Sequence, residues 1–335
     1  MTKENVFVLG TVRLAKAQEA ALAEKYNIHY SAPTREEVLK QLKDAKSDGI
    51  VFKAFYRGFA SHYTYGRADK LLLDQFPEGL KLIASVGAGY DFVDVNVATR
   101  NKQLVTNTPG VVDDASADAT VLLMLSTLRH QYEIEYAMRN QLGISPRMGR
   151  DPEGLTIGIV GMGGIGRAVA KRVLAMGMKV IYHNRQPVSE ALISQEPHLK
   201  ETTYISSLDE LLETSDVVSI HVPLSPETHH LFGEKQFAKM KRGSYVINTS
   251  RGPVVDEEAL VNALESGHIA GAGLDVFENE PKVHPALLKS MNVALMPHLA
   301  TFTKETITNM ETLAMKNIDH YLYSGTPLTP VNDIN

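Results

Sequence analysis

The sequence contains no cysteine among its 335 residues. This absence excludes disulfide bonds, thiolate nucleophiles and cysteine-ligated metals. A chain of this length needs no disulfide for stability, so the absence favours a reducing compartment only weakly. No metal site is expected either, because His221, His229 and His230 lack a carboxylate partner at helical spacing.

The sequence also lacks the features that mark binding to charged or apolar surfaces. It has no dense block of Lys and Arg, and its net charge is −5, so it carries no electrostatic footprint for a nucleic acid. No stretch approaches the roughly 20 apolar residues of a membrane span, and no apolar run follows a basic segment near residue 1. We therefore expect neither a nucleic acid nor a membrane as a partner, and we expect a cytoplasmic location.

The length and the composition indicate a globular protein of two domains. Domains usually contain roughly 100–200 residues, so this chain has enough residues for two separate cores. Hydrophobic residues make up 44% of the sequence and charged residues 22%, which is close to the average for globular proteins. A disordered or fibrous protein is therefore not expected.

Short apolar runs alternate with helical patterns over the first 110 residues. We predict strands at residues 6–9, 48–54 and 80–86 and a helix at 15–26. Such alternation is typical of βαβ units with a mainly parallel sheet. A helical pattern at 115–139 is long enough to bridge two domains.

The alternation becomes regular from residue 155 onward and predicts a dinucleotide-binding domain. The six predicted strands cover residues 156–160, 179–182, 217–221, 244–248, 273–276 and 293–296. The helices between them are predicted at 165–175, 208–213, 233–240 and 257–265. A last amphipathic helix, with Ile307, Met310, Ala314 and Ile318 on one stripe, is expected to pack back on the N-terminal domain.

We therefore predict an α/β protein with two Rossmann-like doubly wound domains and a cleft between them. The substrate domain is expected to be flavodoxin-like and discontinuous, formed by residues 1–110 and 301–335. Residues 111–300 are expected to form the dinucleotide-binding domain.

A glycine-rich segment at 161–166 directly follows the apolar strand at 156–160 and opens a helical pattern. In such a loop, Gly161 makes the tight turn, Gly163 lets the backbone approach a pyrophosphate, and Gly166 lets the helix meet the strand. The N–H groups at the start of the helix then bind the pyrophosphate. The alternative is a tight turn with no ligand. The cofactor-binding candidates of this loop are Gly161, Gly163, Gly164, Ile165 and Gly166.

The residues after the next strand indicate which dinucleotide is bound. A site for NAD usually places Asp or Glu about 20 residues after the glycine loop, where it accepts from the ribose 2′-hydroxyl. This sequence has Asn184 and Arg185 there. A guanidinium matches a 2′-phosphate, so NADP(H) is the preferred cofactor and NAD(H) is possible. The alternative is a solvated surface arginine with dual cofactor use.

Three polar residues follow later strands of the same domain, at the sheet edge where ligands of open α/β sheets bind. His298 is a suitable acid or base near neutral pH, and Glu280 is suited to fixing its tautomer. Arg251 is suited to holding a carboxylate and polarising a carbonyl group. Each of these residues alone is also typical of a structural position, but together with the glycine loop they indicate an oxidoreductase.

Four ordered motifs, spread over nearly the whole chain, resemble those of the D-isomer-specific 2-hydroxyacid dehydrogenases. The motifs are the loop at 161–166, Asn248-Thr249-Ser250-Arg251-Gly252, Gly273-Leu274-Asp275-Val276-Phe277 with Glu280-Pro281, and Pro297-His298. The resemblance implies that Arg251 binds the substrate, that Glu280 orients the acid/base and that His298 exchanges the proton. It also implies that Asp275 faces the nicotinamide side of the cofactor.

Further segments are similar to those of the same family. Residues 86–91 resemble its substrate loop, in which backbone N–H groups take the carboxylate of the acid, and the substrate-binding candidates are Val86, Gly87, Ala88, Gly89, Arg251 and His298. The resemblance also implies a homodimer that forms through the cofactor domain and the helix at 115–139. The remaining cofactor-binding candidates are Thr120, Val222, Pro223, Thr249, Ser250, Arg251, Asp275 and His298.

Within the family, residues 151–154 and 182–185 resemble the fungal glyoxylate/hydroxypyruvate reductase branch. This implies NADPH-dependent reduction of a small 2-keto acid to the 2-hydroxy acid. Phe302 and the aromatic residues at 55–65 depart from the usual pattern, which leaves open an NAD-dependent enzyme for bulkier, mandelate-like substrates. Ordinary packing is the commoner role of aromatic residues. A dinucleotide-sensing corepressor on the same scaffold is the alternative from another functional class.

Overall fold

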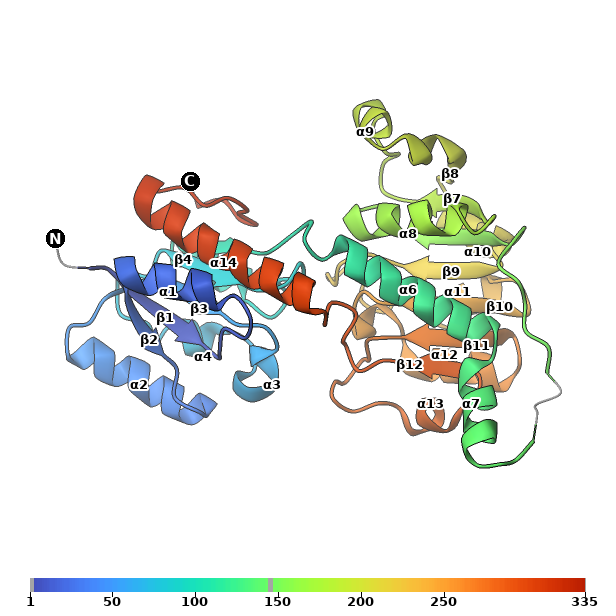
Figure 1. The fold of residues 1–335 in the computed structure, drawn as a ribbon, viewed down its shortest axis with the longest axis horizontal. Helices are drawn as coiled ribbons and strands as arrows, with labels where there is room; N and C mark the ends of the chain where they lie inside the picture. Colours follow the sequence, from blue (N-terminus) through green and yellow to red (C-terminus); the bar gives the residue numbers. More distant parts are fainter. Residues whose placement is uncertain (1–2, 144–146, 335) are drawn as a thin grey trace. The chain divides into compact units, whose positions relative to one another are not determined.

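The computed structural model describes residues 3–143 and 147–334. The chain divides into two compact units, of which the first combines Met1–Val112 with Phe302–Asn335 and the second is Asp113–Thr301. Each unit has a sheet whose paired strands are all parallel, with helices on both faces (Figure 1). The predicted α/β fold class is therefore confirmed.

The first unit has a five-stranded sheet with the order β2-β1-β3-β4-β5, which is the order of flavodoxin-like folds. Its strands are β1 Asn5–Leu9, β2 Asn27–Tyr30, β3 Phe52–Arg57, β4 Leu82–Ser85 and β5 Leu104–Thr106. Its helices are α1 Lys16–Lys25, α2 Arg35–Ser47, α3 Ser61–Tyr65, α4 Lys70–Leu73, α5 Val95–Arg100 and α14 Lys304–Ser324.

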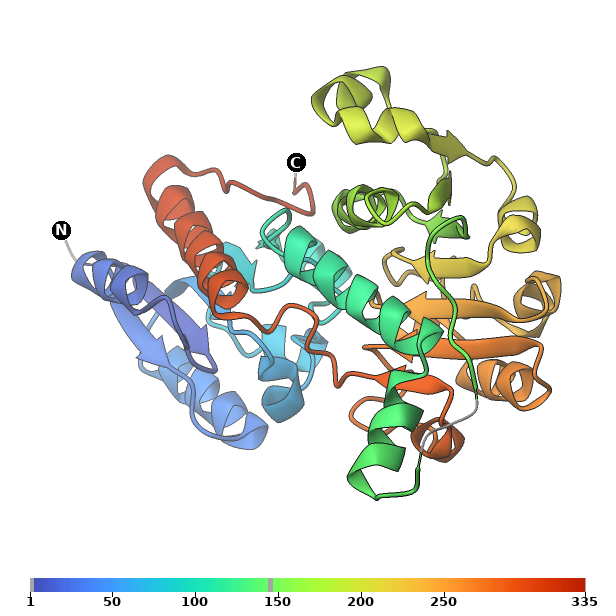
Figure 2. The same cartoon turned by 45° about the vertical axis from the view of Figure 1, so that its right-hand side comes forward.

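The C-terminal helix α14 completes the first unit, where it runs beside α1 (Figure 2). Glu311 of α14 is fully buried, and its carboxylate accepts the backbone N–H groups of Arg13, Leu14 and Ala15 at 2.7–3.0 Å. A buried carboxylate needs such donors, since an unsatisfied charge in the interior is costly. These bonds join the last helix of the chain to the segment that leads into its first helix.

Two predictions for the first unit need correction. The strand predicted at 48–54 is wrong in position, because α2 continues to Ser47, Asp48 forms its C-cap and β3 begins only at Phe52. The helix starts with a capping box in which Thr34 and Glu37 bond reciprocally, and the prediction overlooked it. Strands β2 and β5 were also missed, and β2, with the residues NIHY, contains no buried residue and no apolar run.

The second unit has a seven-stranded sheet with the order β12-β11-β10-β9-β6-β7-β8. Its strands are β6 Thr156–Val160, β7 Lys179–His183, β8 Thr202–Tyr204, β9 Val217–Ile220, β10 Ser244–Asn248, β11 Ile269–Leu274 and β12 Val293–Leu295. With β6 taken as strand 1, the order read from β8 is 3-2-1-4-5-6-7, which is the dinucleotide-binding order 3-2-1-4-5-6 with one additional strand. The sequence predicted six strands and missed β8, a three-residue strand at the sheet edge.

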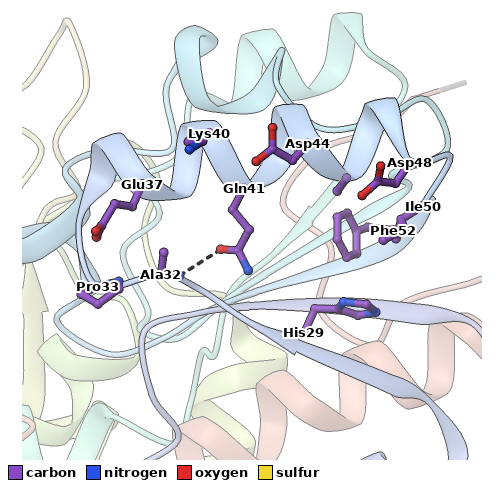
Figure 3. A pocket seen from close by; sticks show the side chains of 11 residues that line it. His29, Ala32, Pro33, Glu37, Lys40, Gln41, Asp44, Asp48, Ile50 and Phe52 are labelled. Carbon is purple, nitrogen blue, oxygen red and sulfur yellow. Dashed lines mark hydrogen bonds between the residues drawn. The ribbon is translucent and has the colours of Figure 1, made fainter.

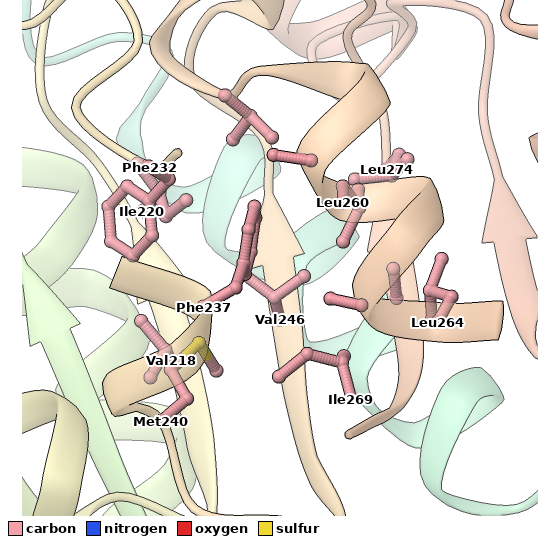
Figure 4. Packing of buried hydrophobic residues seen from close by; sticks show 14 of the residues in the cluster. Val218, Ile220, Phe232, Phe237, Met240, Val246, Leu260, Leu264, Ile269 and Leu274 are labelled. Atoms are coloured by element: carbon pink, nitrogen blue, oxygen red, sulfur yellow. The ribbon is translucent and has the colours of Figure 1, made fainter. Parts of the chain in front are cut away.

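Helices cover both faces of this sheet. They are α6 Asp113–Leu128, α7 Gln131–Arg139, α8 Gly164–Leu174, α9 Glu190–Gln195, η1 Pro197–Glu201, α10 Leu208–Thr214, α11 Glu234–Lys239, η2 Gly252–Val254, α12 Glu257–Glu265 and α13 Pro285–Lys289. Side chains of α6 and α8 form the core on one face, and those of α10, α11 and α12 form it on the other. On the latter face Phe237, Met240 and Leu260 pack against Val218 and Val246 of the strands (Figure 4).

The continuous helix predicted at 115–139 is in fact two helices. His130 has a φ of 51°, in the left-handed region, and this residue separates α6 from α7. Residues other than glycine rarely adopt this backbone conformation. An apolar stripe in the sequence carries no signal for it, and the break was therefore not predicted. Among the described residues, no helix is both long and apolar enough to span a membrane.

Candidate active site

The glycine loop connects β6 to α8, and three of its glycines differ in what a Cβ atom would contact at their positions. Gly161 has a φ of +101°, and a Cβ there would lie 2.7 Å from the carbonyl oxygen of His221. A Cβ on Gly166 would overlap the carbonyl oxygen of Gly161, so this glycine lets the helix meet the loop. Gly163 has open space on its Cβ side. The loop therefore fits a dinucleotide, because the backbone at Gly163 is open to a pyrophosphate.

The carboxylate of Asp113, the first residue of α6, lies against Gly164 of this loop, and the sequence analysis overlooked it. A Cβ on Gly164 would overlap the carboxylate of Asp113, so only glycine fits at this position while Asp113 is in place. Burial raises the pKa of the Asp113 carboxyl, and the positive charge of Arg167 opposes this effect. A half-buried carboxylate thus lies beside the N-terminus of α8.

The loop after β10 is folded by the side chain of Asn248. Its Oδ1 accepts both the N–H and the hydroxyl of Ser250, at 3.0 and 2.8 Å, and its Nδ2 donates to the carbonyl oxygen of Arg251 at 3.0 Å. The Nη1 of Arg251 donates to the carbonyl oxygen of Ser250 at 2.7 Å. Asn248 therefore sets the backbone from which the Arg251 side chain projects. The sequence analysis used Asn248 only as part of a motif.

Asp275 organises the loop after β12 that carries His298. Its two carboxylate oxygens accept the N–H groups of Leu299 and Ala300 at 2.8 and 3.0 Å, and its carbonyl oxygen accepts that of His298 at 2.6 Å. Burial raises the pKa of this carboxyl, and the two N–H donors oppose the effect. The resemblance implied that Asp275 faces the nicotinamide. The structure shows that both of its oxygens bind the loop of His298.

His298 and Glu280 form a hydrogen-bonded pair. The Nδ1 of His298 lies 2.8 Å from Oε2 of Glu280, and Oε1 of Glu280 accepts the N–H of Phe277 at 3.1 Å. Because Nδ1 is engaged in this way, Nε2 is the ring nitrogen suited to proton exchange with a substrate. The backbone at Gly252 lies directly against that of Phe277, so the loop of Arg251 packs against the loop of Glu280. The three predicted residues therefore follow three adjacent strands, β10, β11 and β12.

Thr120 and Thr249 join helix α6 to the loop after β10. The hydroxyl of Thr120 donates to the carbonyl oxygen of Ser116 at 2.8 Å and lies 2.8 Å from the hydroxyl of Thr249. Thr120 is buried. Since its own proton is used, Thr120 accepts from Thr249 and fixes the position of that residue.

Four predicted cofactor-binding residues, Asn184, Arg185, Val222 and Pro223, lie after β7 and β9. Arg185 is exposed, Asn184 and Val222 are half-buried, and Pro223 is exposed. The hydrogen bond from the Ser225 hydroxyl lowers the pKa of Glu227, and the charge of Arg185 contributes to this effect. The sequence analysis missed Glu227, which places a carboxylate close to the guanidinium that is expected to recognise a 2′-phosphate.

The predicted substrate loop follows β4 of the first unit, and part of its backbone is already engaged. The N–H of Val86 donates to the carbonyl oxygen of Arg57 at 3.0 Å, and that of Gly87 donates to the Thr108 hydroxyl at 2.9 Å. Within the described part of the chain, the N–H groups of Ala88 and Gly89 have no such protein acceptor. The N–H groups of Val86 and Gly87 are therefore already used within the first unit, and anion binding by this loop stays a prediction.

Arg57, which the sequence analysis did not single out as charged, is 2% exposed at the end of β3. Its Nη1 lies 3.4 Å from the hydroxyl of Ser85, just before the substrate loop, and its guanidinium lies 5.1 Å from the ring centre of Phe92, just after it. Phe55 and Tyr56 are buried in the core. These two aromatic residues are thus packing residues and do not enlarge a substrate pocket.

A groove of about 520 Å³ in the first unit contains none of the predicted site residues. It lies between α2 and the strands β2 and β3, where Gln41 of α2 accepts the N–H of Ala32 at 2.9 Å (Figure 3). His29 on its floor bonds Asn5 at 3.1 Å. His29, Glu37 and Gln41, which line this groove, form hydrogen bonds within the first unit.

Comparisons with known proteins extend over both units. Residues 121–300 match the family model described as D-isomer specific 2-hydroxyacid dehydrogenase, NAD binding domain. The chain is 39% identical over 329 residues to 4-methyl-2-oxopentanoate reductase A of Aspergillus oryzae, which covers 98% of this chain and 97% of the relative. A glyoxylate reductase from Paecilomyes thermophila superposes with a TM-score of 0.91 at 39% identity and covers 99% of both chains. An NADPH-dependent glyoxylate/hydroxypyruvate reductase from Sinorhizobium meliloti, in complex with NADP and malonate, gives 0.84 at 31% identity and covers 99% of this chain and 98% of its own.

Proposed function

The chain belongs to the D-isomer-specific 2-hydroxyacid dehydrogenases, and on that premise we propose that it reduces glyoxylate or hydroxypyruvate to the 2-hydroxy acid with NADPH. As a member of this family it is an NAD(P)-dependent oxidoreductase that acts on small 2-keto or 2-hydroxy acids. The observation that carries the proposal is the 2.8 Å pair of Glu280 and His298, located on a sheet that also carries the glycine loop.

Each of the three polar residues has a distinct task in the proposed reaction. The reduced nicotinamide supplies the hydride to the carbonyl carbon when it is bound. His298 donates the proton from Nε2 to the carbonyl oxygen, so that one C–H and one O–H bond form. Glu280 accepts from Nδ1, which keeps the ring oriented and stabilises its positive charge before transfer. Arg251 binds the carboxylate and polarises the carbonyl group.

The test of this proposal is a panel of 2-oxo acids with both cofactors. Loss of NADPH or NADH absorbance is followed with glyoxylate, hydroxypyruvate, 4-methyl-2-oxopentanoate and phenylglyoxylate. We expect the highest kcat/KM with glyoxylate or hydroxypyruvate and NADPH. If none of the four acids is reduced with either cofactor, the proposal is wrong.

The second candidate function is the reduction of a branched 2-oxo acid. It is favoured by the 39% identity to 4-methyl-2-oxopentanoate reductase A over nearly the whole chain. Phe302 is also 49% exposed in the first unit, where it stacks on Phe59 with ring centres 6.0 Å apart. A higher kcat/KM for 4-methyl-2-oxopentanoate than for glyoxylate would select this candidate.

The preference for NADPH rests on Arg185. A charge-assisted hydrogen bond contributes about 1.5–3 kcal/mol, so Arg185→Gln is expected to raise the Kd of NADPH roughly 10- to 100-fold and to change that of NADH little. Glu227→Gln is the matched variant, because it removes a carboxylate that competes for the same guanidinium, and it is expected to tighten NADPH binding. Equal effects on the two cofactors would contradict the preference.

We also propose a homodimer that forms through α7 of the second unit. None of the residues of α7 is buried, and Tyr132, Ile134, Tyr136 and Met138 are 42–79% exposed. Ile134 and Met138 are four residues apart and lie on one side of the helix, and exposed apolar surface of this kind marks an interaction site. Light scattering after gel filtration is expected to give twice the chain mass for the wild type and less for the variant that combines Ile134→Glu and Met138→Glu. Leu71→Glu, at an exposed apolar residue of the first unit, is the control, and a monomeric wild type would overturn the proposal.

A further inference from the structure

His221 lies where the glycine loop meets the neighbouring strand. Strands β6 and β9 are paired, with Val160 opposite Ile220, and the N–H of His221 donates to the carbonyl oxygen of Val160 at 2.8 Å. The chain leaves β6 toward β7 on one side of the sheet and leaves β9 toward β10 on the other. In open α/β sheets, ligands bind in the crevice at such a reversal of strand order. His221 and Gly161 are the first residues after the two strands that flank this crevice.

The imidazole of His221 has one satisfied nitrogen and one unsatisfied nitrogen. Side chains two residues apart on a strand share a face of the sheet, and Nε2 of His221 lies 2.8 Å from the hydroxyl of the fully buried Ser219. Nδ1 is also buried, and it has no hydrogen-bond partner among the residues that the structure describes. Buried polar atoms are rarely left without a partner, so Nδ1 calls for one that the chain does not supply.

The surroundings of the ring favour a neutral imidazole. Burial lowers the pKa of His221 to about 4, so the ring is uncharged near neutral pH. When the Ser219 hydroxyl donates to Nε2, the ring proton is on Nδ1, which is then a donor. The pyrophosphate and ribose groups of a dinucleotide are rich in hydrogen-bond acceptors, and both cofactors have them.

We propose that His221 is a further cofactor-binding residue, which donates a hydrogen bond from Nδ1 to the part of the dinucleotide that NADPH and NADH share. This assignment rests on dinucleotide binding by the second unit and is independent of which 2-oxo acid is reduced. It also differs from the role of Arg185, which is expected to distinguish the two cofactors. In the sequence analysis, His221 was considered together with His229 and His230 as a metal ligand, and no metal site was expected.

Two amide substitutions test the proposal by separating the two ring nitrogens. The amide nitrogen of Asn takes the place of Nδ1, whereas that of Gln takes the place of Nε2. The Kd values of NADPH and NADH are measured by titration calorimetry for the wild type, His221→Asn and His221→Gln. One hydrogen bond corresponds to roughly a 5- to 30-fold change in affinity, so we expect His221→Gln to weaken both cofactors by this factor and His221→Asn to bind within about threefold of the wild type.

The melting temperature separates cofactor binding from a structural role of the imidazole. We expect His221→Gln to melt at or above the temperature of the wild type without cofactor and to gain less from saturating NADPH, because ligand stabilisation follows affinity. Three results would overturn the proposal: Kd values of His221→Gln equal to those of the wild type, His221→Asn binding as weakly as His221→Gln, or a lowered melting temperature of His221→Gln without cofactor. A wild type that binds NADPH but reduces no 2-oxo acid would refute only the proposed function.

Discussion

Two histidines follow strands of the same sheet in the second unit, and they differ in the side chain that each ring bonds. His298 is partly exposed and bonds a carboxylate, that of Glu280, at 2.8 Å. His221 bonds a hydroxyl, that of Ser219, at the same distance, and its Nδ1 is buried. A carboxylate partner suits a ring that must carry a proton to a substrate, whereas an enclosed ring with a hydroxyl partner remains neutral. The side-chain partner, and not the place after a strand, thus separates the proposed acid from the proposed hydrogen-bond donor.

The two loops are also held by different means. The loop of His298 depends on the carboxylate of Asp275, and His298 itself has a φ of 55°. The segment of His221 is held by strand pairing, because its N–H continues the ladder between β9 and β6. The loop of the proposed acid, His298, therefore depends on a side-chain contact, whereas the segment of the proposed donor, His221, depends on the sheet.

The largest expected effect separates the two histidines by kinetics. His298→Ala removes the proton donor, so kcat is expected to fall by about 10²- to 10⁴-fold, while the Kd of NADPH stays close to that of the wild type. His221→Gln is expected to give the opposite pattern, a raised Kd with kcat retained at saturating cofactor. Steady-state kinetics and cofactor titration of both variants check this contrast. Near-normal turnover of His298→Ala would contradict it.

The second effect concerns the carboxylate partner of His298. Glu280→Gln replaces a charge-assisted hydrogen bond with a neutral one, and kcat is expected to fall roughly 10- to 100-fold with little change in cofactor affinity. Glu278→Gln is the control, since this nearby carboxylate bonds His230 at 2.8 Å instead. It is expected to keep kcat within a few-fold of the wild type. Equal losses in the two variants would show that negative charge in the loop, and not the pair with His298, is what matters.

The third effect is a dependence of the free energy of unfolding on pH that is caused by the protonation of His221. Its pKa is about 4 in the folded chain and 6.5 in the unfolded chain, so the unfolded chain takes up the proton first as the pH falls. The stabilisation is complete above pH 6.5, and the free energy of unfolding is expected to fall by about 2 kcal/mol from pH 7 to pH 5. The free energy of unfolding is measured by urea denaturation at several pH values, and it should change less with pH in His221→Gln than in the wild type. His229→Gln, which removes an exposed histidine, is the control and is expected to keep the pH dependence of the wild type. An unchanged pH dependence in His221→Gln would show that His221 does not cause it.

The smallest effect is expected at Ser219. Ser219→Ala leaves Nε2 of His221 without its partner, so the proton is no longer held on Nδ1, and the loss of about 1 kcal/mol corresponds to roughly fivefold weaker binding of NADPH. Ser215→Ala is the control, because Ser215 is equally buried and its hydroxyl donates to the carbonyl oxygen of Leu211 at 2.6 Å. Calorimetric titration of both variants measures the difference. Identical Kd values would mean that Ser219 does not orient the imidazole.

Residue identity and position after a strand were sufficient to predict much of the site. Gly161, Arg251, Glu280 and His298 were predicted from the sequence because hydride-transfer chemistry needs those residue types and parallel strands bring their carboxyl ends to one edge. Their roles in the reaction stay predictions. The doubly wound architecture was predictable for a similar reason, since strands buried on both faces read as apolar runs. Strands β2 and β8 were not, because their residues, NIHY and TTY, do not form an apolar run and none of them is buried.

What only the tertiary structure decided is which atoms are already engaged. Asp275 binds the backbone of the His298 loop, the N–H groups of Val86 and Gly87 are used within the first unit, and Nδ1 of His221 has no partner in the described chain. These facts depend on hydrogen bonds between residues far apart in the sequence, and neither composition nor spacing encodes such distances. The sequence by itself therefore determined the class of chemistry and the cofactor-binding fold. The packing of loops from neighbouring strands decided which groups can carry out that chemistry.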